Sequence, residues 1–124
     1  MSVEVAVSIN GFSELQFKLD RLDFSMRSRV DEALNQEVSN MRAVAQSLAP
    51  KRSGYLASTV YAERVGDWAF KLGARAQYAY FVEFGTRFMR ARRFLSRALE
   101  SAMPGLVQRV SQAVREAIAE AGGT

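Results

Sequence analysis

The sequence predicts an α+β domain in which a small, mostly antiparallel β-sheet packs with one long α-helix and a C-terminal α-helix. Three observations predict this class. Apolar residues alternate near the N-terminus and in the middle of the chain, they recur at helical spacing between these regions, and they do so again near the C-terminus. The chain has 124 residues, 48% of them hydrophobic, which suffices for one core. We therefore expect residues 1–124 to form a single domain.

Alternating apolar residues predict a half-buried strand at the N-terminus, carried by Val3, Val5, Val7 and Ile9. Asn10-Gly11 ends this strand, and Ser13 then offers an N-cap for a short helix. The apolar stripe of this helix is Phe12, Leu15, Leu19 and Leu22.

A long helix is predicted over residues 25–48, because no glycine or proline interrupts the helical pattern before Pro50. Its apolar face comprises Met26, Val30, Leu34, Met41, Ala45 and Leu48. At 1.5 Å per residue the helix is about 35 Å long, which is longer than a compact globule of this mass is wide, given a radius of gyration of roughly 14 Å. We expect it to protrude or to lie against another element, with a neighbouring subunit as the simplest candidate.

The middle of the chain is predicted to form a β-hairpin, with strands at Leu56–Val65 and Trp68–Gly73 and a turn at Gly66-Asp67. The aromatic segment Tyr78–Phe84 fits a strand or a short helix. A helical turn is favoured, because Tyr78, Phe81 and Val82 would share a face.

Two apolar stripes predict helix near the C-terminus. Pro104 is expected to break or restart the helix between them, and Gly122-Gly123 to end it. The first stripe is Phe94, Ala98 and Ala102, and the second is Leu106, Val110, Val114, Ala117 and Ala121.

The composition argues against most catalytic and metal sites. The chain has no cysteine and no histidine, so it lacks a thiolate nucleophile, the usual general base and the commonest metal ligand. No cluster of acidic residues has the spacing of a cation-binding loop. We expect no enzyme, no cofactor and no metal. The N-terminus does not resemble a signal peptide, and the longest apolar run, Tyr78–Val82, is too short to span a bilayer, so we expect a cytoplasmic chain without membrane contact.

The net charge of +4 is unevenly distributed. Residues 51–97 hold ten basic and three acidic side chains, a net +7, whereas the flanking parts are slightly acidic. Five arginines lie within eleven residues: Arg87, Arg90, Arg92, Arg93 and Arg97. They are either a solvated surface or a surface that meets a polyanion or an acidic partner. Lys51 and Arg52 fall in a loop that is expected to be exposed, and a contact of this loop with a neighbour or with DNA stays open. No recognition-helix pattern is present, so any contact with DNA would be to phosphates.

Each of three residues, Glu83, Gly54 and Gly85, has both a functional and a structural interpretation. Glu83 sits among aromatic residues, where an acid can serve as a proton donor. We favour a carboxylate that ties down backbone N–H groups or pairs with an arginine, because no second catalytic group accompanies it. Gly54 and Gly85 lack the context of a phosphate-binding loop, and we expect turn glycines with positive φ.

Three motifs carry a resemblance to a known family. Residues 49–60, APKRSGYLASTV, are similar to the pattern AP-x-x-[ST]-G-x-L-x-x-S/T-[IV]. Residues 78–86, YAYFVEFGT, are similar to YA-x-[YF]-VE-[FY]-GT, and residues 94–99, FLSRAL, to FL-x-x-AL. In this order they resemble the gene-product-ten-like family of tailed phages, the neck or tail-completion proteins of lambdoid siphophages and their prophage relatives. The family often has a proline just before the Phe-Leu pair, where this chain has Arg92-Arg93.

The resemblance implies a noncatalytic virion protein of the head–tail interface. Such a protein would assemble in the host cytoplasm into a ring, commonly of six copies, around the DNA channel. Its partners would be the tail terminator or tail tube, the head–tail connector and, where the arginines face the channel, DNA phosphates. The motif residues expected to be structural are Pro50, Gly54, Leu56, Tyr78, Glu83, Gly85, Thr86 and Phe94.

Two other functions stay open from the sequence. The first is a free, basic protein that binds nucleic acid without sequence specificity, which the arginine-rich segment favours. The second is a magnesium-dependent hydrolase that uses carboxylates, which would require Glu83 and other acids to converge in one pocket.

Overall fold

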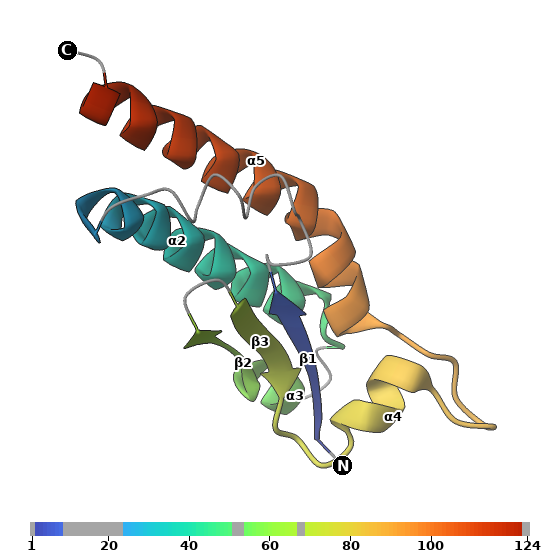
Figure 1. Ribbon diagram of the computed structural model, residues 1–124. Coiled ribbons are helices and arrows are strands. Elements are labelled where there is room, and N and C mark those ends of the chain that lie inside the picture. The colour runs from blue at the N-terminus through green and yellow to red at the C-terminus, as the bar shows by residue number, and fades with distance from the viewer. Residues whose placement is uncertain (1, 9–23, 51–53, 67–68, 123–124) are drawn as a thin grey trace.

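The computed structural model describes residues 2–8, 24–50, 54–66 and 69–122 (Figure 1). These residues form an α+β fold, as the sequence predicted. The elements are β1 (Val3–Ser8), α2 (Phe24–Leu48), α3 (Tyr55–Ser58), β2 (Val60–Gly66), β3 (Ala69–Ala74), α4 (Ala79–Phe84) and α5 (Phe94–Gly122). The short helix expected after Ser13 lies outside the described residues, as do the proposed strand end at Asn10-Gly11 and Trp68.

The described strands form one antiparallel sheet of order β1-β3-β2. Val5 pairs with Leu72, and Leu72 pairs with Ala62, so the three strands present these side chains on the same face. Phe70 and Leu72 of the central strand are fully buried there. Strands β2 and β3 pair antiparallel, which confirms the predicted pairing, but Gly66, expected in the turn, is the last residue of β2 and pairs with Ala69. The first strand is also confirmed.

The segment around Leu56 corrects the predicted strand. Residues Tyr55–Ser58 form the helical turn α3 instead, and β2 begins only at Val60. The hydroxyl of Ser58 donates to the carbonyl of Tyr55 at 2.6 Å, and the hydroxyl of Thr59 donates to the carbonyl of Leu56 at 2.8 Å. These local bonds give the backbone an alternative to a sheet ladder.

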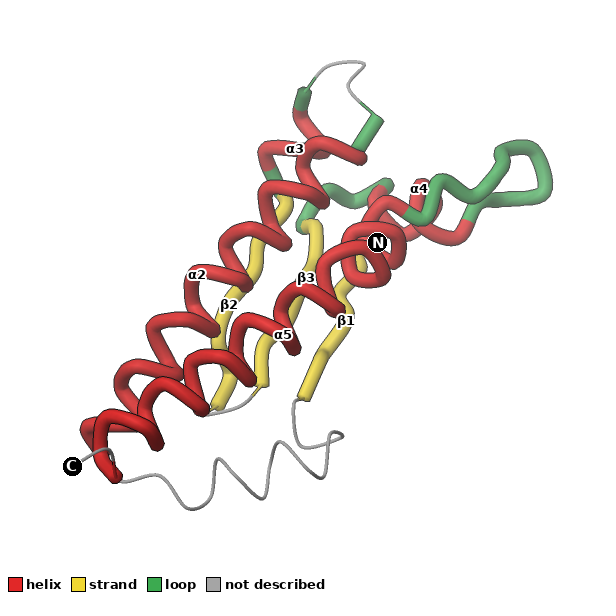
Figure 2. The backbone as a smooth tube through the Cα atoms, turned by 90° about the horizontal axis from the view of Figure 1, so that it is seen from above, coloured by secondary structure: helices red, strands yellow, loops and turns green. Residues whose placement is uncertain are grey.

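The core lies between the sheet and a pair of long helices. Helix α2 packs against β2, and α5 runs alongside α2 on the same side of the sheet (Figures 1 and 2). With 25 and 29 residues, the helices are about 37 and 43 Å long. The buried residues that they bring together include Val30, Leu34, Val38, Met41 and Ala45 of α2, and Phe94, Leu95, Ala98, Leu106, Val110 and Val114 of α5.

This helix pair corrects the expectation that a neighbouring subunit is the simplest candidate to cover α2. The helix is as long as predicted, but α5 of the same chain covers its apolar face. The two long helices give the molecule an elongated shape (Figure 1), and α2 does not protrude on its own.

The predicted break at Pro104 was also wrong, because α5 continues through this residue to Gly122. A proline within a helix removes one backbone hydrogen bond and crowds the carbonyl four residues earlier. Pro104 and Gly105 lie on the exposed side of α5, whereas Ala98 and Leu106 on either side of them are buried. Packing of both halves against the core therefore keeps the helix in one piece.

The sheet face away from the helix pair carries a polar cluster centred on Tyr61. Its hydroxyl donates to Glu4 Oε2 at 2.6 Å, and Lys71 Nζ lies 3.7 Å from Glu4 Oε1. The guanidinium of Arg75 lies 3.9 Å from the centre of the Tyr61 ring. The ring lies across Gly73, where an added Cβ would come within 2.7 Å of it. The cluster ties β1 to β2 across the central strand.

The cluster shifts two pKa values. The hydrogen bond from Tyr61, followed by the charge of Lys71, lowers the pKa of Glu4 below its usual value. Burial, followed by the hydrogen bond to Glu4, raises the pKa of Tyr61 to about 12. Tyr61 therefore remains a protonated donor at neutral pH.

Truncating Leu106 tests the helix pair. Leu106→Ala removes a fully buried side chain, so we expect the free energy of unfolding to fall by about 2–5 kcal/mol in urea denaturation. Gln108→Ala, at an exposed position on the same helix, is the control and should change it by less than about 0.5 kcal/mol. Equal effects of the two substitutions would contradict the packing described.

Removing the Tyr61 hydroxyl tests the polar cluster. A carboxylate with a lowered pKa in the folded state contributes stability above its unfolded pKa, and this contribution is lost as the pH falls through the folded value. Tyr61→Phe removes the main cause of the shift, so the pKa of Glu4 should rise and its contribution to the acid sensitivity of folding should shrink. NMR titration of the Glu4 carboxyl carbon measures this. Tyr80→Phe is the control, and an unchanged Glu4 pKa in Tyr61→Phe would refute the assignment.

Candidate functional site

The three motif segments meet at one end of the molecule, where α3, α4 and the start of α5 come together (Figure 1). The rings of Tyr55 and Tyr78 are 6.2 Å apart, centre to centre. The backbone N–H of Arg75 donates to the carbonyl of Thr59 at 3.2 Å, and that of Ala76 donates to Thr59 Oγ1 at 3.2 Å. Segments that are distant in the sequence thus form one structural unit.

Glu83 joins α4 to the first turn of α5. Its side chain is buried, with 1% exposed. The N–H of Leu95 donates to Oε1 at 2.8 Å, the N–H of Ser96 donates to Oε2 at 3.2 Å, and the Ser96 hydroxyl donates to Oε2 as well. The first N–H groups of a helix have no partner within it, and the helix dipole favours a negative charge there. The Glu83 carboxylate supplies the missing acceptors and a negative charge at the start of α5. This confirms that Glu83 ties down backbone N–H groups.

Between α4 and α5 the chain forms a projecting loop, residues 85–93, which we call the arm (Figure 2). Thr86 and Met89 pair across it, with their N–H groups donating to each other's carbonyls at 2.9 and 3.2 Å. At its base, the N–H of Arg92 donates to the carbonyl of Val82 at 2.8 Å, and that of Arg93 donates to the carbonyl of Glu83 at 3.2 Å. The arm is therefore closed by backbone hydrogen bonds at its tip and at its base.

Two residues fix the direction of the arm. Gly85 has φ 78°, and an added Cβ would lie 2.7 Å from the backbone nitrogen of Ala91. Arg93 has φ 48°, and its guanidinium pairs with Glu100 at 2.9 Å. A proline ring holds φ near −65°, so the backbone at Arg93 is one that a proline could not adopt.

Exposed aromatic side chains lie on α4, at its N-cap and at the tip of the arm. We call this group the aromatic patch, and it consists of Tyr78, Tyr80, Phe81, Phe84 and Phe88. The ring of Tyr80 lies 4.8 Å from that of Phe84 and 5.8 Å from that of Phe81, centre to centre. Phe88, at the tip of the arm, is 90% exposed. Isolated exposed aromatics are ordinary, but the ring of Tyr80 contacts those of Phe81 and Phe84, and a contiguous group of this kind marks an interaction surface.

The patch corrects the face predicted for the aromatic segment. The helical turn itself is confirmed as α4, but its buried residues are Ala79, Val82 and Glu83, whereas Tyr78 and Phe81 are about 40% exposed. The sequence did contain a signal for this: four aromatic residues in the six-residue helix α4 and its N-cap are too many for one helical face.

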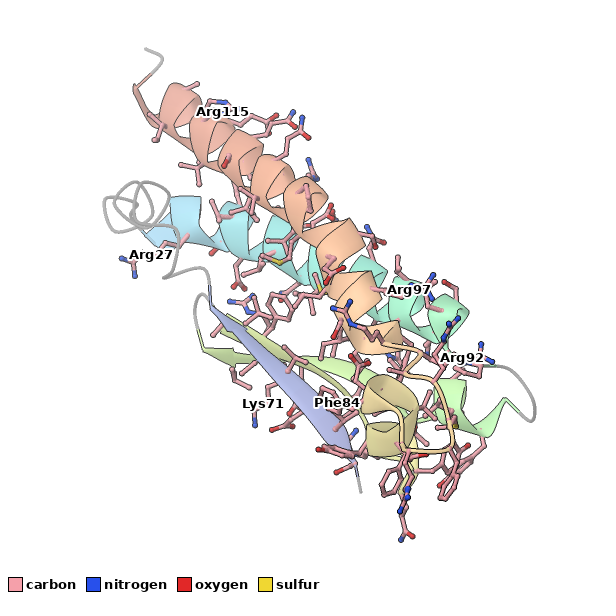
Figure 3. All side chains as sticks on the ribbon, turned by 90° about the vertical axis from the view of Figure 1, so that its right-hand side faces the viewer. Arg27, Lys71, Phe84, Arg92, Arg97 and Arg115 are labelled. Atoms are coloured by element: carbon pink, nitrogen blue, oxygen red, sulfur yellow. The ribbon has the colours of Figure 1, made fainter. Side chains whose placement is uncertain are left out.

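All five arginines of the predicted cluster are exposed. Four of the arginines line an open hollow of about 500 Å³, which we call the arginine hollow. The hollow is lined by Met89, Arg90, Ala91, Arg92, Arg93 and Arg97. Arg92 and Arg97 are labelled in Figure 3. Arg87 lies apart, with its guanidinium 5.3 Å from the centre of the Phe88 ring. Lys51 and Arg52 lie outside the described residues.

The remaining motif residues have structural positions. Leu56 and Phe94 are buried in the core, and Pro50 follows the end of α2 in a half-buried position. Gly54 has φ 76°, as expected of a turn glycine. Thr86 accepts the N–H of Phe88 on its side-chain oxygen at 3.1 Å, within the tip of the arm.

Neither a metal site nor a membrane span is found in the described part of the chain. No group of three or more acidic side chains there could hold a metal ion. None of the described helices is both long and apolar enough to cross a membrane. Comparison of the chain with models of protein families, with curated proteins and with solved structures gives no match.

Replacing Glu83 tests the junction between α4 and α5. Glu83→Ala leaves the buried N–H groups of Leu95 and Ser96 without an acceptor, so the free energy of unfolding should fall by about 1–3 kcal/mol. Hydrogen exchange of these two amides should accelerate more than that of amides in the middle of α5. Glu32→Ala, at an exposed position on α2, serves as the control. Unchanged exchange at Leu95 and Ser96 would contradict the proposed cap.

Proposed function

We propose that this protein is a structural joint of a phage particle, a subunit of the ring at the head–tail interface. The observation that carries the proposal is that the three motif segments, which resemble those of neck and tail-completion proteins, gather at one end of the molecule. The arm connects the second of these segments to the third, and it lies at the same end of the molecule as the exposed aromatic side chains and the arginine hollow. A surface of this kind serves a protein that acts by binding other proteins.

The composition of this end supports a role in protein assembly. Aromatic residues, methionine and arginine are enriched at the centres of protein interfaces, where they contribute most of the binding free energy. Phe84, Phe88 and Met89 expose 57%, 90% and 42% of their surfaces. Burying them against a partner would remove apolar surface from water, which is the main driving force for association.

A closed ring suits the rest of the fold. In the described part of the sheet, β1 and β2 are edge strands, and an edge strand can pair with another chain. A head-to-tail contact between identical copies closes into a ring when its rotation allows. Six copies is the number that the resemblance implies, with the tail terminator or tail tube and the connector as neighbours. The role requires no cofactor, metal or catalytic group.

A second candidate is nonspecific binding of nucleic acid, which the exposed arginines favour. It predicts that the isolated monomer binds duplex DNA tightly and that the affinity falls steeply with salt. The joint predicts weak binding of DNA by the monomer.

The joint is tested in the phage or prophage that encodes the chain. Cryo-electron microscopy of the particles should locate a ring of this protein at the neck. Phe88→Ser should leave heads and tails that fail to join and reduce infectious yield at least roughly tenfold, because it removes the most exposed aromatic of the arm. Ile118→Ser, which changes an exposed apolar residue on the distal half of α5, should have little effect. Particles whose necks lack the protein would refute the proposal.

A further inference from the structure

We propose that the arginine hollow binds an acidic, partly apolar segment of a partner protein, with its carboxylates on the guanidiniums and its apolar side chains on the arm. This inference rests on the proposed joint and names the chemistry of its partner. Of the two partners considered for the arginines, an acidic protein and DNA phosphates, it favours the acidic protein.

Three of the four arginines around the hollow have no acidic partner in the described part of the chain. Among the described residues, no side-chain hydrogen bond or ion pair is made by Arg90, Arg92 or Arg97, whereas Arg93 pairs with Glu100. Like charges held around one hollow repel each other, and the repulsion grows when water is excluded. A closed interface at this surface therefore requires an anionic partner.

The binding groups would be the guanidiniums and not the start of α5. The buried carboxylate of Glu83 already accepts the N–H groups of Leu95 and Ser96, so these donors are not available to a ligand. A guanidinium offers a planar pair of donors that matches a carboxylate in a two-point contact. The hollow, of about 500 Å³, is large enough for several carboxylates.

The apolar half of the surface favours a protein over duplex DNA. Met89 lines the hollow and is 42% exposed, and Phe88 next to it is 90% exposed. The phosphate backbone of a duplex presents anions but no apolar side chains that could cover these residues. A segment that carries both acidic and apolar side chains satisfies both parts of the surface. Single-stranded DNA, whose bases can stack on aromatic rings, is the alternative that the test must distinguish.

Binding of labelled probes to the full-length chain, measured by fluorescence anisotropy, tests the proposal. The probes are a peptide of alternating glutamate and leucine, a peptide of alternating glutamate and serine, a DNA duplex and an oligothymidine. We expect the glutamate–leucine peptide to bind most tightly. Replacing Arg90, Arg92 and Arg97 together with glutamine should weaken its binding at least about tenfold.

Two further variants separate the mechanisms. Replacing the same three arginines with lysine keeps the charge, so binding governed by phosphate charge should change little, whereas two-point carboxylate binding should weaken several-fold. Phe88→Ser should weaken binding of the glutamate–leucine peptide more than binding of the glutamate–serine peptide. The control is the double variant Arg109→Gln with Arg115→Gln, which removes two positive charges from the distal half of α5. It should change the affinity for the glutamate–leucine peptide by less than about twofold.

The relative affinities of the peptide and DNA probes either support the acidic partner or exclude it. Tighter binding of either DNA probe than of the peptides, or full retention of peptide binding in the glutamine variant, would overturn the inference. Light scattering of the same samples reports ring formation separately. Rings that bind no acidic peptide would reject the partner chemistry and leave the joint standing, whereas peptide binding by a protein absent from particle necks would reject the joint alone.

Discussion

The carboxylate of Glu83 connects α4 to the first turn of α5, and the geometry of the exposed end depends on this contact. The same residue contributes its backbone carbonyl to the base of the arm, where it accepts the N–H of Arg93. One buried acid thus satisfies the start of the longest helix and holds the two sides of the arm together. A buried charge is costly unless it is fully hydrogen-bonded, and here the bonds that satisfy it also set the position of the interaction surface.

The rest of the molecule supports this end. Helices α2 and α5 bury their apolar faces against each other and against the sheet, so the apolar face of the long helix α2 is covered within the chain. The large exposed apolar side chains are concentrated instead around α4 and the arm. A fold that is closed along its length and apolar at one end presents a defined surface to other proteins.

Periodicity predicted the elements that tertiary packing reinforces, and failed where local contacts or packing overrode it. The extent of α2 and the antiparallel pairing of β2 with β3 were predicted from the spacing of apolar residues, although Gly66 lies at the end of β2 and not in the turn. The strand assigned to Leu56 failed because the hydroxyls of Ser58 and Thr59 close a helical turn. The break at Pro104 failed because the core holds both halves of α5. In the site, the exposure of the arginines and the role of Glu83 were predicted, whereas the exposure of Phe81 and the left-handed backbone at Arg93 depend on contacts that no local pattern encodes.

The backbone of the arm and its exposed side chains have different constraints, as the tight turn at Gly85 shows. A side chain at this position would collide with the backbone of Met89 and Ala91, so the turn tolerates no other residue without rearrangement. The side chains of Arg87, Phe88 and Arg90, by contrast, face solvent, and the backbone pairing between Thr86 and Met89 does not involve them. A lineage can therefore adapt to a new neighbour by exchanging these three residues while the scaffold beneath them stays constant.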